Sequence, residues 1–217
     1  MSRLTDALDA LVEQHRRLGS SIPDFLRPGL EPADARRSIE AIGLDPPDDI
    51  AELFGWHDGF DQAAWASTPG GAGFPRLWGD TYFAPLDGAI VEYGKALQIE
   101  RVSAQTELMA YGRVITSAAI WRESWFPVFS GGDETYAEDC AAGPGRGRIF
   151  DVHWHPGGSD EPIRPRFASL TALAEAVVRR FEQGAYAWNA GIRFLDERRD
   201  VLERLERVER AEAEGLA

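Results

Sequence analysis

Apolar residues recur every three or four positions at the start of the chain, a spacing typical of an amphipathic helix. The positions are Leu4, Leu8, Leu11, Val12, His15 and Leu18. Ser2 precedes this stripe and can cap the helix, and Gly19 follows it and can end it. We therefore predict one helix between these two residues, with its apolar side toward a core.

Prolines mark the start of two further helices. Pro32 opens one that ends near Gly43, and the run Pro46-Pro47-Asp48-Asp49 opens another that ends around Trp56. We expect Trp56 in the core, because it follows Leu53 at helical spacing and tryptophan is usually mostly buried.

Small residues, Gly and Pro dominate residues 62–80, which predicts a long loop anchored by aromatic side chains. Its Gly70-Gly71-Ala72-Gly73 run lacks the preceding apolar strand and the Lys-Ser/Thr end of a phosphate-binding loop. We predict a short strand over 82–86 and a helix over 87–98. The pattern over 99–120 assigns no element.

Alternation of apolar and polar residues predicts antiparallel strands over 125–130, 135–140 and 148–155, the first two joined by a tight turn at 131–133. Ser169 can cap a helix whose apolar positions form one stripe from Leu170 to Phe181. A last amphipathic segment over 193–214 carries dense Glu and Arg and predicts an exposed or docking helix. These elements define the α+β class, and we expect one domain over 1–190 with a C-terminal helical extension over 191–217.

Composition narrows the range of partners. The formal net charge is -13, which disfavours non-specific binding to nucleic acid or to an anionic membrane. Acidic residues concentrate locally, with nine between Glu31 and Asp61 against Arg36 and Arg37. A basic protein partner would suit this surface, although solubility alone also explains such acidity. No apolar run has the length of a membrane span or signal peptide, so we expect a cytoplasmic protein.

Several short motifs together resemble the SUKH superfamily. They are Pro-Pro-Asp-Asp-Ile-Ala-Glu-Leu-Phe-Gly-Trp-His-Asp-Gly (46–59), Phe-Ala-Pro-Leu-Asp (83–87), Trp-Phe-Pro-Val-Phe-Ser-Gly-Gly-Asp (125–133) with Tyr136 and Asp139, and Gly-Arg-Ile-Phe (147–150). The resemblance spans residues 24 to 183, and Asp58 stands where the family commonly has Asn. The motif positions with a structural role would be Trp56, Gly59, Pro127, Tyr136 and Asp139.

The superfamily takes its name from yeast regulators of cell-wall synthesis and includes bacterial proteins that neutralise toxins. The resemblance implies a mixed, largely antiparallel sheet packed against helices. It also implies a binding scaffold, often an immunity protein that covers a toxin's active site, with no catalytic residues.

Candidate binding residues lie in the predicted turns and on one strand face. Asp151, His153 and His155 alternate with the apolar side chains of the last predicted strand, so all three share the opposite face. Imidazole and carboxylate groups at two-residue steps can converge on a metal ion. An exposed polar face explains the same pattern, and we predict no metal and no cofactor. The candidate partner-binding residues are Asp58, Asp61, Asp133, Glu134, Asp151, His153 and His155.

No nucleophile motif accompanies the single Cys140, which we predict to be a buried structural residue in a reducing compartment. The leading hypothesis is a non-catalytic immunity protein that binds a cognate toxin domain, for which a basic nuclease is one candidate. The alternatives are a regulatory or scaffold protein that dimerises through its C-terminal helix, and a small enzyme that uses Asp151, His153 and His155. The sequence leaves monomer and homodimer open.

Overall fold

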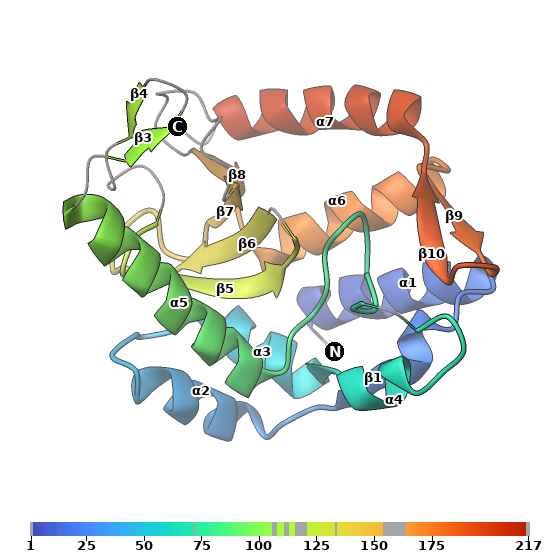
Figure 1. Ribbon diagram of the computed structural model, residues 1–217, viewed down its shortest axis with the longest axis horizontal. Helices are drawn as coiled ribbons and strands as arrows, with labels where there is room; N and C mark the ends of the chain where they lie inside the picture. Colours follow the sequence, from blue (N-terminus) through green and yellow to red (C-terminus); the bar gives the residue numbers. More distant parts are fainter. Residues whose placement is uncertain are drawn as a thin grey trace.

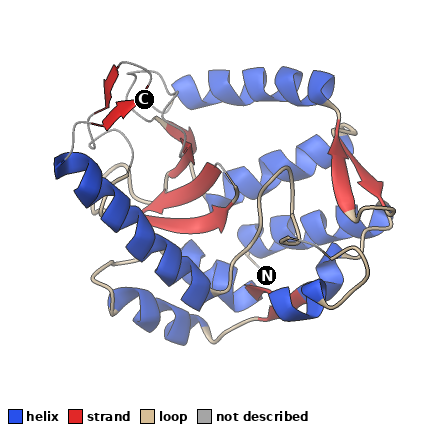
Figure 2. Ribbon diagram, viewed as in Figure 1, coloured by secondary structure: helices blue, strands red, loops and turns tan. Residues whose placement is uncertain are grey.

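A computed structural model describes residues 2–71, 73–105, 108–110, 113–115, 121–132, 134–153 and 164–215 (Figures 1 and 2). The helices are α1 (Arg3–Arg17), the short 3-10 helix η1 (Ile22–Phe25), α2 (Pro32–Glu40), α3 (Asp48–Trp56), α4 (Gln62–Ala66), α5 (Leu86–Gln105), α6 (Leu170–Glu182) and α7 (Arg199–Glu214). The strands are β1 (Leu26–Pro28), β2 (His57–Phe60), β3 (Leu108–Ala110), β4 (Arg113–Ile115), β5 (Trp125–Ser130), β6 (Glu134–Asp139), β7 (Ile149–His153), β8 (Pro165–Phe167), β9 (Tyr186–Asn189) and β10 (Phe194–Glu197). The α+β class is confirmed.

A four-stranded sheet of order β5-β6-β7-β8 forms the centre, and β1-β2, β3-β4 and β9-β10 form separate pairs. Every strand pairing among the described residues is antiparallel, which confirms the largely antiparallel character that was predicted, while no described pairing is parallel as a mixed sheet requires. Each strand of the central sheet pairs with the next one along the chain. Such neighbours join without the long crossover that a parallel pair would need.

The predicted helices at both ends of the core are confirmed. Ser2 Oγ accepts a hydrogen bond from Thr5 N at 3.1 Å, and Ser169 Oγ accepts one from Ala172 N at 3.2 Å. α1 and α6 pack against each other, and the His15 and Phe181 rings lie 5.0 Å apart. α5 packs along β5 (Figure 1). Within the described residues, no helix has both the length and the apolar character needed to cross a membrane.

The segment after α6 differs from its prediction. Residues 194–197 form β10, which pairs with β9 in a hairpin, and the last helix starts only at Arg199. Leu195 of the hairpin is fully buried. Val208, which was expected on the apolar side of the helix, is more than half exposed.

Arg193 sits in the turn of this hairpin in a left-handed conformation, with φ of 52°. Its guanidinium lies 4.4 Å from the centre of the Trp65 ring and donates to Ser21 Oγ at 2.8 Å. These contacts attach the hairpin to the N-terminal half of the domain.

Three other segments also depart from the sequence interpretation. The expected loop 62–80 begins with the short helix α4. The expected strand over 82–86 is reduced to a single bridge between Tyr82 and Ser130, and the helix predicted over 87–98 extends to Gln105. Cys140 is buried as predicted, and burial raises the pKa of its thiol to about 12.

His15 is fully buried on α1 as a neutral imidazole. Its Nε2 lies 2.8 Å from the Leu77 carbonyl oxygen, and its Nδ1 lies 3.2 Å from Ser20 Oγ, which fits an Nε2–H tautomer. Burial lowers the pKa of His15 from 6.5 to about 4. As the pH falls, His15 of the unfolded chain therefore becomes protonated near pH 6.5, whereas His15 of the folded chain becomes protonated only near pH 4.

We predict that His15 alone removes about 2 kcal/mol of stability between pH 7 and pH 5. His15→Gln keeps a donor for the Leu77 carbonyl without a titrating ring, so its free energy of unfolding should fall by that much less over the same interval. Urea denaturation of both proteins at the two pH values gives the difference. Equal pH slopes would contradict the prediction.

Glu138 is also fully buried, on the face of β6 that meets α3. Neither carboxyl oxygen accepts a hydrogen bond from the described residues. Burial raises its pKa well above the ordinary 4.5, and the negative charge of the nearby Asp49 raises it further. The folded chain thus retains a proton that the unfolded chain releases, and this group costs stability as the pH rises above 4.5.

Glu138→Gln should stabilise the protein at pH 7 by at least about 1 kcal/mol, because the amide needs no proton and can donate toward Asp49. The gain should shrink toward pH 4, where the wild-type carboxyl is mostly neutral in the unfolded chain as well as in the folded one. Chemical denaturation at pH 4, 5.5 and 7 tests this trend. A variant less stable than wild type at pH 7 would show that the carboxylate has a stabilising partner.

Candidate functional site

Two of the predicted binding acids serve the fold. Asp58 lies in β2 and not in an exposed turn, and it is only 5% exposed. Its Oδ1 accepts a hydrogen bond from Leu86 N at 2.8 Å, and its Oδ2 lies 2.9 Å from Arg27 Nη2. Asp61 is exposed and caps α4 by accepting a hydrogen bond from Ala64 N at 2.8 Å. Asp58 is thus committed to structure, and Asp61 keeps one face toward solvent.

The residues at the motif positions have structural contacts as well. A side chain at Gly59, where φ is 67°, would place Cβ 2.3 Å from Pro85 N. Pro127 lies at an irregularity in the pairing of β5 with β6. Tyr136 is buried against Trp78 and Phe167, and Asp139 accepts hydrogen bonds from Ser124 Oγ and Ala141 N.

Trp56 is half-buried, which corrects its expected core position. Its Nε1 donates to Asp9 Oδ1 at 2.8 Å, and its ring stacks over Phe83 with centroids 6.4 Å apart. One part of the indole remains exposed at the end of α3.

Three candidates come together on one face of the sheet. Strand register sets Glu134 of β6 opposite His153 of β7 and Tyr136 opposite Asp151. Asp151 and His153 share a face, as the alternation predicted, and Glu134 joins them from the neighbouring strand. Asp133 and His155 lie outside the described residues.

This carboxylate–histidine cluster (Glu134, Asp151, His153) opens into a cleft of about 730 Å³. The walls come from the sheet face, from Arg166 of β8 and Arg180 of α6, from the β9-β10 hairpin and from α7. Both signs of charge line it: Asp80, Asp196, Glu197 and Glu206 face Arg166, Arg180, Arg199 and Arg210. The cleft is therefore a polar site, and its sheet face contributes the two carboxylates and the imidazole of the cluster.

Negative charge on the Glu134 carboxylate is disfavoured in this cluster. Burial raises the pKa of Glu134, and the neighbouring Asp151 carboxylate raises it further. The Asp151 carboxylate also raises the pKa of His153, whose Nε2 lies 3.3 Å from Asp151 Oδ1. Thr81 Oγ1 donates to Glu134 at 3.1 Å. A positive charge placed among these three groups would be stabilised.

A buried ion pair closes the cleft from behind. Arg180 Nε lies 3.0 Å and Nη2 lies 2.5 Å from the two carboxylate oxygens of Glu209 on α7, and both side chains are about 5% exposed. Arg166 Nη2 approaches the same carboxylate at 3.3 Å. Burial alone would lower the pKa of Arg180, but the bond to Glu209 and the nearby Tyr136 and Tyr186 raise it. The sequence interpretation missed this pair.

Glu209→Ala should cost about 3–5 kcal/mol, because it leaves the Arg180 guanidinium buried without its bidentate partner. The matched control is Glu212→Ala on the same helix. Glu212 makes an exposed pair with Arg179 at 3.8 Å, so its loss should change stability by less than about 1 kcal/mol. Thermal and urea denaturation of the two variants measure the difference. Equal costs would mean that α7 is held by other contacts.

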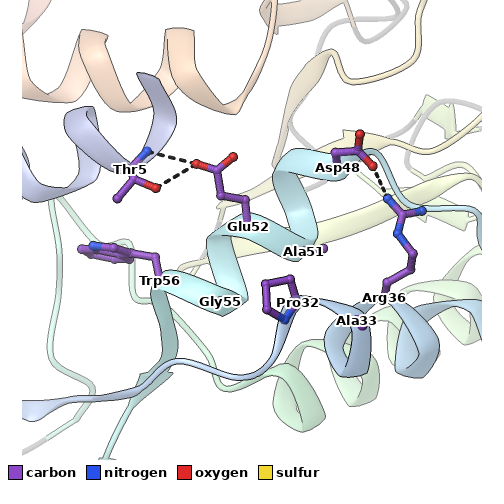
Figure 3. A pocket seen from close by; sticks show the side chains of 9 residues that line it. All are labelled: Thr5, Pro32, Ala33, Arg36, Asp48, Ala51, Glu52, Gly55 and Trp56. Carbon is purple, nitrogen blue, oxygen red and sulfur yellow. Dashed lines mark hydrogen bonds and ion pairs between the residues drawn. The ribbon is translucent and has the colours of Figure 1, made fainter. Parts of the chain in front are cut away.

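A second hollow lies at the N-terminal helices, a groove of about 540 Å³ between α1, α2 and α3 (Figure 3). Apolar atoms of Pro32, Ala33, Ala51 and Gly55 form its floor, and Trp56 stands at one end. Arg36 pairs with the fully exposed Asp48 at the other end. Between them, Glu52 accepts hydrogen bonds from Thr5 N at 3.2 Å and Thr5 Oγ1 at 2.8 Å.

The acidic segment between Glu31 and Asp61 surrounds this groove, but much of its charge is paired. Arg36 contacts Glu40, Asp45 and Asp48, and Arg37 contacts Asp34. Arg146 reaches Asp45 from a distant part of the chain at 3.0 Å. Counting Arg27 beside Asp58, four arginines stand among nine acids, and the region keeps an excess of negative charge.

No protein-family model matches this chain, and no match was found among curated proteins. The resemblance to the SUKH superfamily stays a prediction from the motifs.

Proposed function

We propose that this chain is a non-catalytic protein-binding module whose groove between α1, α2 and α3 receives a basic segment of a partner. The specific form we propose is a cytoplasmic, SUKH-like bacterial immunity protein, and the partner is then a cognate toxin domain. The observation that carries the proposal is a groove with an apolar floor, the half-buried Trp56 at one end and the carboxylates of Asp48 and Glu52 in its lining.

The groove chemistry favours an arginine or lysine side chain. The apolar stem of either residue can pack on Pro32, Ala51 and Gly55, and its charged head can reach Glu52 or Asp48. The Trp56 ring offers a cation–π surface in the same groove. Interfaces commonly obtain most of their binding energy from a few such anchors, with tryptophan enriched among them.

The charge excess supports the same partner class. Acids near the groove outnumber the arginines that contact them, so the long-range field around α2 and α3 attracts cations. Such a field raises the association rate more than the final affinity, which suits rapid capture of a basic toxin.

Dimerisation through the C-terminal helix has less support. Val201 and Leu202 of α7 are buried against the rest of the chain, and Glu209 of α7 pairs with Arg180 of α6. Val208 is the large apolar side chain that α7 exposes among the described residues. Because α7 buries its apolar side chains against its own core, it exposes too little apolar surface for a stable dimer interface.

The test is calorimetric binding of the purified protein to the protein encoded by the neighbouring gene, at 50 and 500 mM NaCl. Asp48→Arg reverses an exposed rim charge, and Trp56→Ala removes the anchor. The matched control is Glu203→Arg, an exposed charge reversal on α7, which lies at the opposite edge of the molecule from α2 (Figure 1). We expect both groove variants to weaken binding at least about tenfold, the control to stay within about twofold, and high salt to weaken binding.

Absence of binding at 50 mM NaCl would overturn the proposal, as would equal effects of the groove and control variants. Light scattering on the same samples separates a heterocomplex from a self-association of this chain, which would also contradict it.

A further inference from the structure

The sheet face in the cleft brings three metal-ligand types to one point. Glu134 Oε, Asp151 Oδ and His153 imidazole nitrogen atoms all lie within 4.8 Å of one another. The arrangement follows from strand geometry: residues i and i+2 of β7 share a face, and the residue opposite one of them on β6 completes a triangle. No loop rearrangement is needed to assemble it.

The spacing is close to what an ion requires. Two donors on opposite sides of an ion at about 2.1 Å each stand about 4.2 Å apart, and tetrahedral donors about 3.4 Å apart. Small rotations of the partly exposed Glu134 and His153 side chains therefore close the triangle.

Asp151 Oδ1 gives a second observation. This atom is buried and accepts no hydrogen bond from the described residues. His153 Nε2 lies 3.3 Å from it and is the nearest charged partner that the described residues give this oxygen. A buried carboxylate oxygen is normally satisfied by a donor. This contact places an imidazole nitrogen and a buried carboxylate oxygen at a spacing that two ligands of one ion can also adopt.

The two arginines that act electrostatically on the cluster, Arg180 and Arg166, are already engaged by another acid. Arg180 is held in a bidentate pair by Glu209, and Arg166 approaches the same carboxylate. Arg180 lowers the pKa of Glu134 only as a minor influence, behind burial and Asp151. The cluster keeps two carboxylates against one titratable imidazole.

We propose that Glu134, Asp151 and His153 bind a divalent transition-metal ion in the cleft. Imidazole together with carboxylate favours zinc or a neighbouring first-row ion over magnesium and calcium, which prefer all-oxygen sites. Three protein ligands leave coordination positions free toward the cleft, the ligand number typical of open zinc sites. This site is independent of the groove and of the proposed protein-binding function.

The experiment titrates chelator-treated, full-length protein with ZnCl2 by calorimetry, with MgCl2 and CaCl2 as comparison ions. We expect one Zn²⁺ per chain, a rise in Tm, and weak or no binding of Mg²⁺ and Ca²⁺. Two single variants, His153→Ala and Asp151→Asn, each remove one ligand atom and should weaken Zn²⁺ binding at least about 100-fold. Because His153 is exposed, its variant should fold normally, which circular dichroism checks.

Asp196→Asn is the matched control, since Asp196 lines the same cleft from β10 but stands outside the cluster. Its affinity for Zn²⁺ should stay within about threefold of wild type. Cobalt absorption spectra of wild type and His153→Ala give a second readout, because loss of the imidazole changes the ligand field. The proposal is overturned if Zn²⁺ does not bind stoichiometrically, if Mg²⁺ binds as tightly, or if both ligand variants bind like wild type.

Discussion

The buried ion pair between Arg180 and Glu209 joins the terminal helix α7 to the core helix α6. Arg180 comes from the apolar stripe of α6, Glu209 from the inner face of α7, and Arg166 of β8 approaches the same carboxylate. One buried acid therefore connects a core helix, the last strand of the sheet and the terminal helix. Desolvating these charges is expensive, and an apolar contact of the same shape could hold α7 as firmly. The charges fix the orientation of α7 on α6, because a bidentate guanidinium accepts only one orientation of the carboxylate. That position sets the wall of the cleft.

The two ends of one sheet face have opposite environments because of what covers them. At one end Phe126 packs on Phe54 and Tyr93, and there the described residues give the buried Glu138 carboxyl oxygens no hydrogen-bond donor. At the other end α7 and the β9-β10 hairpin leave space, and Glu134, Asp151 and His153 line it. Every second residue of β6 thus carries a carboxylate or a phenol on this face. A carboxylate at the covered end, Glu138, lowers stability because it is buried, whereas the carboxylate of Glu134 at the open end is accessible from the cleft.

Helices could be predicted from the sequence where a capping residue stands directly before apolar residues at helical spacing. α1 and α6 each have a serine cap followed by apolar residues at helical spacing, and both appear as expected. The last helix was started too early because Leu195 stands seven residues before Leu202, a helical spacing that arises by coincidence between a strand and a helix. The pattern of the short β9 and β10 strands gave too little signal against it. Tertiary contacts of Arg193 with Trp65 and Ser21 hold that hairpin, and no local pattern reports them.

The candidate sites were predictable in the same uneven way. Alternation along β7 places Asp151 and His153 on one face, but Glu134 joins them only through the register of β6 with β7. A glycine-rich connection of nine residues separates those strands, so the register cannot be counted from the sequence. Arg180 and Glu209 did leave a signal. Each is a charge inside an apolar stripe, seven residues after Leu173 and Leu202, and the two charges have opposite signs.

Net charge is a weak guide to a binding surface until its partners inside the chain are known. Asp58 is buried against Arg27, Asp61 caps a helix and Asp34 pairs with Arg37, so these acids contribute less to an outside field than their number implies. The carboxylate of Asp48 is different, because its side chain is fully exposed and its partner Arg36 also contacts Glu40 and Asp45. Arg146 also contacts Asp45, so two arginines stand against these three acids and leave one negative charge in excess. Asp48 and Glu52 are the acids of this segment that line the groove, and Trp56 lines it with them.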